Sequence, residues 1–176
     1  MKNYGAAVGA CKARVMRRDI EIRHVEQLAE IGECHAVMME LRPNLPDVEA
    51  FIRQVERQGE QGYRLSAAWS GSRIVGIIGY RLQENFLHGR HVFVDDLVVR
   101  EEVRGDGVGA LLLSAARAYA RQQRCGYFVL ETGLHKVLAQ RFYFRQGMLP
   151  YAIGFVETLA DPDEQALSWP KPALGR

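Results

Sequence analysis

Hydrophobic and polar residues alternate over residues 20–25, and this period of two predicts a short strand. From residue 28 the apolar positions change to helical spacing, which predicts a helix up to about residue 41. The sequence RPNLPD at residues 42–47 ends that helix, because its two prolines flank a turn and Asp47 is suited to cap a second helix. Helical spacing then continues to about residue 58, where GEQG ends the second helix.

The middle of the chain is rich in strand-forming residues. Residues 63–70 and 73–84 are joined at Gly71-Ser72, a frequent pair in tight turns, and therefore predict a hairpin followed by a third strand over residues 90–100. Beyond it the pattern predicts a helix over 106–123, a strand over 127–132, a helix over 136–147 and a final strand over 148–157. This order of elements indicates an α/β (α+β) domain, in which a mixed sheet has helices on both sides.

One domain accounts for the 176 residues, with residues 1–19 predicted as an extension, 20–157 as the domain and 158–176 as a tail. The formal net charge of +2, without a block of like charge, is too small to indicate a nucleic-acid or membrane partner, and neither is expected. Cys11, Cys34 and Cys125 form no Cys-x-x-Cys pair, so neither a disulfide framework nor a zinc site is expected. A reducing, cytoplasmic location is the simplest interpretation, and no stretch approaches the ~20 apolar residues of a membrane span.

Three glycines, Gly105, Gly107 and Gly109, stand where a predicted strand gives way to an alanine-rich helix. Each costs roughly 0.5–1 kcal/mol relative to alanine inside a regular element, so the glycines indicate a need for accessible backbone. The first N–H groups of a helix have no helical partner and carry the positive end of the helix dipole, which suits them to a phosphate or pyrophosphate. Arg104 can add a charged donor to the same oxygens.

Other interpretations of this loop differ in the spacing they require. A dinucleotide-binding fingerprint needs Gly-x-Gly-x-x-Gly early in the chain with an acidic residue about twenty positions later, and the sequence lacks this pattern. A P-loop needs Gly-Lys-Ser/Thr, which is also missing. The adhesion tripeptide Arg104-Gly105-Asp106 is a chance match at the start of a helix. A tight strand-to-helix turn without a ligand stays open.

The segment DDLVVREEVRGDGVGALLLSAARAYA resembles the coenzyme-binding signature of the GNAT superfamily of N-acetyltransferases, with Arg104, Gly107 and Gly109 at its fixed positions. The stretch LAQRFYFRQGM resembles a second family motif, Ala-x-x-Phe/Leu-Tyr-x-x-x-Gly-Phe/Met, and the matching residues are Ala139, Phe142, Tyr143, Gly147 and Met148. The resemblance covers residues 20–157. It implies the GNAT fold: a mixed, mostly antiparallel twisted sheet of six to seven strands, flanked by about four helices and splayed between the coenzyme strand and the next.

The resemblance implies an N-acetyltransferase with acetyl-CoA as donor, a primary amine as acceptor and no metal. The pantetheine arm would pair with Leu97, Val98 and Val99 as an added strand pairs with a sheet edge, and the Val98 N–H would polarise the thioester carbonyl. Tyr143 would contact the coenzyme and protonate the leaving thiolate. Lys136 stands where many family members carry a coenzyme-binding Asn, and could reach a phosphate or pantetheine oxygen. The pyrophosphate would be bound by Arg104, Gly105, Asp106, Gly107, Val108, Gly109 and Ala110.

The acceptor amine must lose a proton before it attacks, because the pKa of a free alkylamine lies near 10. Glu131, at the end of the strand opposite the splay, is one candidate base. Asp95 and Asp96, just before the coenzyme strand, are the others, and a water chain is a further route. Neighbouring strand residues point to opposite faces, so only one of the two aspartates is expected to face the acceptor.

The identity of the acceptor stays open between small-molecule and protein amines. The loops at residues 41–47 and 83–89 would line its site, and the acidic residues near them, Glu40, Asp47 and Glu84, would favour a cationic amine. A homodimer, a different acyl donor and a non-catalytic acyl-CoA-binding regulator also stay open, the last supported by Lys136. Cys125 has no evident histidine partner for covalent catalysis, and no metal-ligand spacing connects His88, His91 and His135.

Overall fold

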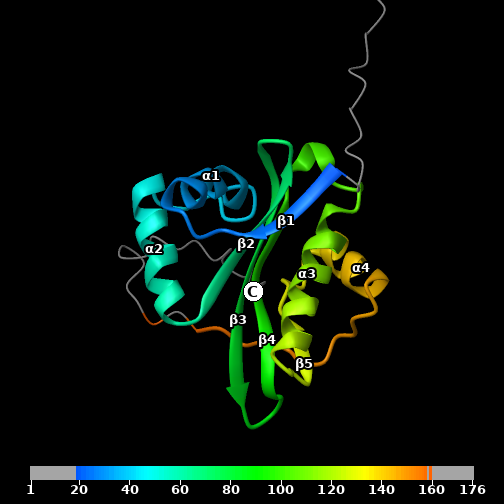
Figure 1. Ribbon diagram of the computed structural model, residues 1–176. Helices are drawn as coiled ribbons and strands as arrows, with labels where there is room; N and C mark the ends of the chain where they lie inside the picture. The colour runs from blue at the N-terminus through cyan, green and yellow to red at the C-terminus, as the bar shows by residue number, and fades with distance from the viewer. Residues whose placement is uncertain (1–18, 158, 160–176) are drawn as a thin grey trace, which may run out of the picture.

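The computed structural model describes residues 19–157 and residue 159, and these contain five strands and four α-helices (Figure 1). The expected extension and tail, with Cys11, lie outside the described residues apart from residues 19 and 159. The elements follow in the order β1 (Ile20–His24), α1 (Leu28–Met38), α2 (Val48–Glu60), β2 (Tyr63–Ser70), β3 (Arg73–Asn85), β4 (Gly89–Val99), the 3₁₀ turn η2 (Glu101–Val103), α3 (Val108–Gln122), β5 (Tyr127–Leu130) and α4 (Val137–Arg145).

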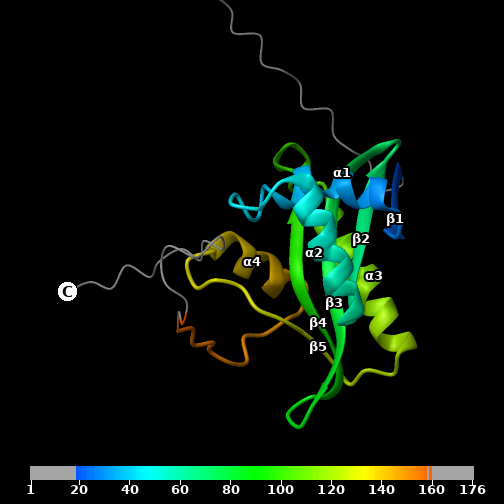
Figure 2. The same cartoon turned by 90° about the vertical axis from the view of Figure 1, so that its left-hand side faces the viewer.

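All five strands belong to one sheet in the order β1-β2-β3-β4-β5. Neighbouring strands are antiparallel except β4 and β5, which run parallel. Because parallel neighbours need a crossover connection, α3 carries the chain from β4 to β5. Helices α1 and α2 cover one face of the sheet and α3 covers the other, while α4 lies beside α3 with Phe142 and Tyr143 against that part of the core (Figures 1 and 2). The expected fold class, a mixed and mostly antiparallel sheet between helices, is confirmed.

The core has two layers because β3 buries side chains on both faces. Ile77 packs on the α1–α2 side and Ile78 on the α3 side, and both are fully buried. A strand buried on both faces needs a nearly continuous apolar run, which RIVGIIGY provides. Gly76 lets α3 approach β3 closely, since a Cβ there would lie only 3.1 Å from Leu112 Cδ1.

The sheet has five strands within the described residues, fewer than the six to seven expected. Residues 148–157, predicted as a final strand from their alternating apolar residues, form no strand and no ladder with β5, so that prediction is wrong. Their large side chains are exposed, among them Leu149 (82%) and Phe155 (93%). The alternation of apolar and polar residues shows which side chains would share a face, but not whether a neighbouring strand lies near enough to pair. In addition, Pro150 lacks the N–H that strand pairing uses.

Candidate functional site

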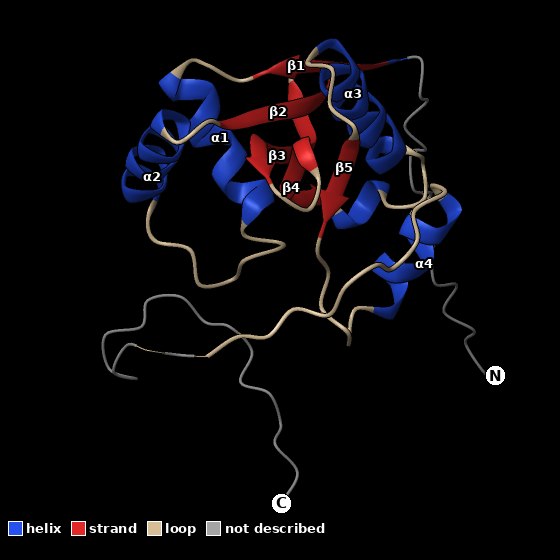
Figure 3. Cartoon of the chain, turned by 90° about the horizontal axis from the view of Figure 1, so that it is seen from below, coloured by secondary structure: helices blue, strands red, loops and turns tan. Residues whose placement is uncertain are grey.

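Strand β4 separates from β5 halfway along its length. The two strands pair only from His91 with Tyr127 to Val94 with Leu130, whereas β4 continues against β3 to Val99. Within the described part of the chain, residues 95–99 therefore have a neighbouring strand on one side only, and β5 is the outermost strand (Figure 3). The predicted splay is thus present, and its open edge offers backbone N–H and C=O groups to a ligand.

Backbone direction decides which of these groups face the splay. The Arg100 N–H donates to Val75 O over 2.9 Å and so points toward β3. N–H groups two residues apart along a strand point the same way, so the Val98 N–H also faces β3, and those of Leu97 and Val99 face the splay. The prediction that the Val98 N–H donates to the thioester carbonyl is therefore wrong. The sequence pattern shows which face of the sheet a side chain occupies, but not which N–H groups are used in pairing with the neighbouring strand.

The glycine loop, residues 104–110, connects β4 and η2 to α3. Gly105 and Gly107 have φ angles of 95° and 91°, a region that is strained for residues with a Cβ. Gly107 is the N-cap of α3, and the Ala110 N–H is bonded to its carbonyl over 3.1 Å. The N–H groups of Val108 and Gly109 precede that bond and belong to the first turn, where a helix offers no acceptor.

Gly109 is required for packing and not for its φ angle. A Cβ on this residue would lie 3.3 Å from Phe142 Cζ and 3.6 Å from Val99 Cγ2. The missing side chain therefore lets α3 begin close to both β4 and α4. Two of the three glycines thus serve backbone conformation and the third serves close approach. Together they place the N-terminus of α3 at the open end of β4, where an anion would meet unpaired N–H groups.

Arg104 turns its guanidinium toward the protein. Its Nε donates to Val99 O over 3.0 Å, and its Nη2 donates to Glu40 Oε2 over 3.2 Å. Glu40 and Asp47, both expected to favour a cationic acceptor, thus have contacts of their own. The Asp47 side chain caps α2 by accepting a 2.8 Å bond from the Ala50 N–H.

Helix α4 brings Tyr143 to the α3 side of the sheet. Its ring packs beside Phe142, with centroids 5.4 Å apart, against the core beneath α3. Burial raises the pKa of the Tyr143 hydroxyl above its ordinary value, so the group is protonated at neutral pH. Lys136 is the N-cap of α4, and Gly147, with a φ of 75°, ends the helix in the left-handed conformation typical of a C-terminal stop.

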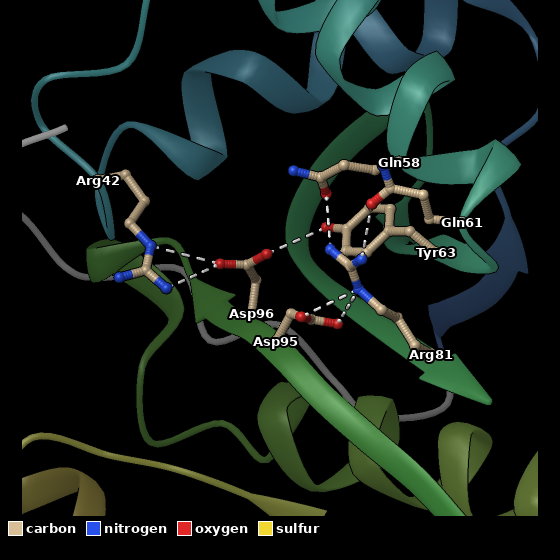
Figure 4. Close-up of polar contacts among 7 residues, drawn as sticks. All are labelled: Arg42, Gln58, Gln61, Tyr63, Arg81, Asp95 and Asp96. Carbon is tan, nitrogen blue, oxygen red and sulfur yellow. Dashed lines mark hydrogen bonds and ion pairs between the residues drawn. The ribbon is translucent and has the colours of Figure 1, made fainter. Parts of the chain in front are cut away.

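A β-bulge in β4 changes the face on which the aspartates lie. Gly79 pairs with Asp96 and the next residue, Tyr80, pairs with Val94, so Asp95 is the extra residue. A bulge interrupts the alternation of faces, and both carboxylates lie on the α1–α2 face, next to each other in Figure 4. The expectation that they point to opposite faces is therefore wrong.

Asp96 has two partners on that face (Figure 4). The Tyr63 hydroxyl donates to Oδ2 over 3.1 Å, and Arg42 Nη2 donates to Oδ1 over 3.1 Å. Gly79 makes the first contact possible, because a Cβ there would overlap the Tyr63 hydroxyl. Burial, reinforced by the negative charge of Asp96, raises the pKa of Tyr63 well above its ordinary value, so Tyr63 remains a donor. The Asp96 side chain is 15% exposed and that of Arg42 is 48% exposed.

Asp95 pairs with a different arginine. Arg81 Nε lies 3.2 Å from each of its carboxylate oxygens, and the same guanidinium contacts two glutamines at the end of α2 (Figure 4). Burial raises the pKa of Asp95, while the positive charge of Arg81 opposes the shift. No motif marks Arg81, Tyr63 or Arg42 in the sequence, because the register of the sheet brings Arg81 and Tyr63 to the aspartates and the turn after α1 brings Arg42.

Glu131 follows directly on β5 and is exposed. Leu130, the last residue of β5, packs against the core beneath α3, and one further strand residue would turn Glu131 toward the α1–α2 face. Among the residues that the structure describes, its carboxylate has no hydrogen bond or ion pair. Glu131 therefore lacks the partners that hold Asp96.

The remaining histidines and cysteines of the described part of the chain form no reactive cluster. His91 is buried and its Nδ1 lies 2.9 Å from Gly89 O. Burial raises the pKa of the Cys34 thiol to about 12, which keeps it protonated. Within residues 19–157 and 159, no group of three or more His, Cys, Asp or Glu is placed to hold a metal ion. Nor does this part of the chain contain a helix with the length and apolar character that crossing a membrane requires.

The sequence matches the acetyltransferase (GNAT) family over residues 22–148, more than half of the chain. It is 32% identical over 124 residues to the uncharacterized N-acetyltransferase YhdJ of Bacillus subtilis (strain 168), covering 68% of this chain and 87% of the relative. It is 29% identical over 148 residues to the aminoalkylphosphonate N-acetyltransferase of Salmonella typhimurium, covering 79% of this chain and 91% of the relative.

Solved structures share the fold. An acetyltransferase from Trypanosoma brucei has a TM-score of 0.69 at 20% identity, covering 80% of this chain and 100% of that chain. AAC(6')-Iy, in complex with the bisubstrate analogue CoA-S-monomethyl-acetylneamine, has a TM-score of 0.71 at 16% identity, covering 80% of this chain and 99% of that chain. The chain therefore belongs to the GNAT family of acetyltransferases, and it is an N-acetyltransferase that takes its acetyl group from acetyl-CoA.

Proposed function

We propose that the enzyme transfers the acetyl group directly to a primary amine, in a ternary complex at the splay between β4 and β5. The observation that carries the proposal is the open edge of β4, which leads directly into the glycine loop and the N-terminus of α3. A pantetheine arm needs peptide-like partners, and a pyrophosphate needs converging N–H groups. Residues 95–110 offer both in one continuous segment.

In this proposal the donor is bound mainly by backbone. Leu97 and Val99 pair with the amides of the pantetheine arm, and residues 104–110 present N–H groups to the pyrophosphate. Lys136, at the N-terminus of α4, adds a positive charge. The Leu97 N–H faces the splay beside Asp96 and polarises the thioester carbonyl. Because β4 is held in the sheet, this donor needs no rearrangement when negative charge develops on the carbonyl oxygen.

The two faces of the sheet separate the two proton transfers. Tyr143 packs on the α3–α4 side, whereas Asp96 lies on the α1–α2 side. The amine therefore approaches from the α1–α2 face, and the thiol leaves toward α4. As the new C–N bond forms and the C–S bond breaks, a proton passes from nitrogen to a carboxylate, and the Tyr143 hydroxyl gives its proton to sulfur. Solvent then restores both residues.

The contacts favour Asp96 as the base. Tyr63 holds Oδ2 and fixes the orientation of the carboxylate, while Oδ1 is held by the half-exposed Arg42. A cationic amine can replace Arg42 at Oδ1 and leave the Tyr63 contact intact. Glu131 lies just beyond the end of β5 without fixed partners and is the alternative.

A small-molecule amine is the acceptor class that we propose. The Salmonella relative is named for an aminoalkylphosphonate, and the AAC(6')-Iy complex contains an acetylneamine analogue. The α1–α2 face of this chain carries two Arg–Asp pairs close together, Arg42 with Asp96 and Arg81 with Asp95. Such mixed charge suits an acceptor that has both a cationic amine and an anionic group.

Gly107→Ala tests the glycine loop as the pyrophosphate site. A Cβ at the cap of α3 would stand where the loop N–H groups converge, so we expect the Kd of acetyl-CoA in calorimetry to rise by about tenfold or more. Gly89→Ala is the matched control, because Gly89 also has a positive φ, 56°, but is the first residue of β4, next to the β3–β4 turn. Both variants should lose about 1–2 kcal/mol of unfolding free energy. Equal Kd values for the two variants would contradict the assignment.

Tyr143→Phe tests the leaving-group acid. The ring and its packing are kept and the proton is lost, so kcat should fall by roughly 100-fold while the Kd of acetyl-CoA changes little. Tyr119→Phe is the control, since Tyr119 is also partly buried in the core beneath α3. Wild-type kcat in Tyr143→Phe, with the chemical step shown to be rate-limiting, would make this tyrosine a packing residue only.

Asp96→Asn and Glu131→Gln separate the two candidate bases. A base acts only when unprotonated, so kcat/KM of the wild type should fall as the pH drops through the pKa of that group. We expect this acidic limb to disappear in Asp96→Asn and to persist in Glu131→Gln, with initial rates measured as free thiol release over pH 4–9 with a panel of amines. The reverse result would assign the base to Glu131.

A further inference from the structure

We propose that Glu40 is a positioning residue for the glycine loop: from the end of α1 it fixes the turn through which β4 enters that loop. The inference rests on the donor site proposed above. Glu40 lies two residues beyond α1 and 61 residues before Glu101, its partner in η2, so the contact joins distant segments of the chain. Its side chain is only 25% exposed.

Two hydrogen-bond donors and one further cation from one short segment converge on the Glu40 carboxylate. The Glu101 N–H donates to Oε2 over 2.9 Å, and Arg104 Nη2 donates to the same oxygen over 3.2 Å. Arg100 Nη1 lies 3.8 Å from Oε1. The residue before η2, Arg100, makes no side-chain capping bond, so Glu40 supplies from a distance the acceptor that the first N–H of this turn needs.

The position of Glu40 is itself fixed. Its N–H donates to Val37 O over 3.1 Å, and those of Leu41 and Arg42 donate to Met38 O over 2.9 Å, which continues the end of α1 as a tight turn. Leu41 packs against the core between the sheet and α1. A carboxylate on such a turn can hold η2 in place, whereas one on a loosely attached loop would move with it.

The contact also sets the direction of Arg104. With Nε on Val99 O and Nη2 on Glu40, this guanidinium is held against the end of β4. The backbone that continues into Gly105 and Gly107 therefore starts from a fixed point. Two arginines balance the negative charge of Glu40, which would otherwise disfavour a phosphate nearby.

An opposite role for Glu40 predicts an opposite result. If Glu40 only competed with phosphate for Arg104, its removal would free the guanidinium and tighten coenzyme binding. If it positions the loop, its removal weakens binding even though a negative charge is lost. The sign of the change in affinity thus separates the two roles.

The experiment compares Glu40→Ala with Glu102→Ala in the full chain. Glu102 lies in the same turn and pairs with Arg73 on the surface, so both variants lose one negative charge and one carboxylate beside the loop. We expect the Kd of CoA in calorimetry to be about tenfold higher for Glu40→Ala than for Glu102→Ala, the effect of a charge-assisted hydrogen-bond cluster. Glu40→Gln, whose amide oxygen still accepts from the Glu101 N–H, should recover part of the loss.

A second readout does not depend on ligand. Hydrogen exchange of the Glu101 amide should be faster in Glu40→Ala than in Glu102→Ala, at similar unfolding free energies of the two variants in urea. Equal or tighter CoA binding by Glu40→Ala would overturn the proposal, as would a fall in affinity with unchanged exchange at Glu101. If Gly107→Ala also binds CoA as tightly as the wild type, the donor site itself is wrong; if only the Glu40 comparison fails, that site stands and this inference falls.

Discussion

Strand β4 must pair with β3 along its whole length and with β5 along only part of it, and the arrangement of the site depends on this constraint. The ladder with β5 stops at Val94 and Leu130, while the ladder with β3 continues to Val99. An unpaired sheet edge is normally a liability because its N–H and C=O groups attract other strands. Here the N–H groups of Leu97 and Val99 face the splay, where a peptide-like arm can pair with them, while the Val99 carbonyl accepts from Arg104 Nε.

The bulge at Asp95 lies at the same point of β4 and decides which side chains of β4 face the α1–α2 layer beside the splay. It turns two adjacent carboxylates to the α1–α2 face, an arrangement that a regular strand forbids. Partly buried carboxylates need partners, and Arg81, Arg42 and Tyr63 supply them. Tyr63 reaches Asp96 only because Gly79 has no side chain. The fold can therefore accommodate the bulge and its two carboxylates only together with the two arginines, the buried Tyr63 hydroxyl and Gly79.

Local patterns in the sequence predicted the features of the fold that depend on neighbouring residues. Periodicity indicated the helices, the hairpin and the crossover through α3, and the glycines indicated where backbone conformation departs from regular structure. The bulge was not predictable, because an extra residue in β4 exists only relative to β3. The direction of the Val98 N–H was not predictable for the same reason, since the pairing with the neighbouring strand decides which N–H groups point toward it. The contact of Glu40 with Arg104 was not predictable, because the two residues are far apart in the sequence. Segment 148–157 was predicted wrongly, because the sequence does not show whether a partner strand lies near enough to pair with it.

Backbone amide resonances during a titration with CoA show whether the open edge of β4 and the glycine loop bind the donor, because this site consists of individual N–H groups. We expect large shifts and slower hydrogen exchange for Leu97, Val99, Val108 and Gly109. We expect little change for Val98, whose N–H faces β3. Shifts concentrated at Val98, or at residues away from β4 and the glycine loop with Leu97 and Val99 unaffected, would contradict the assignment of the open edge of β4 as the donor site.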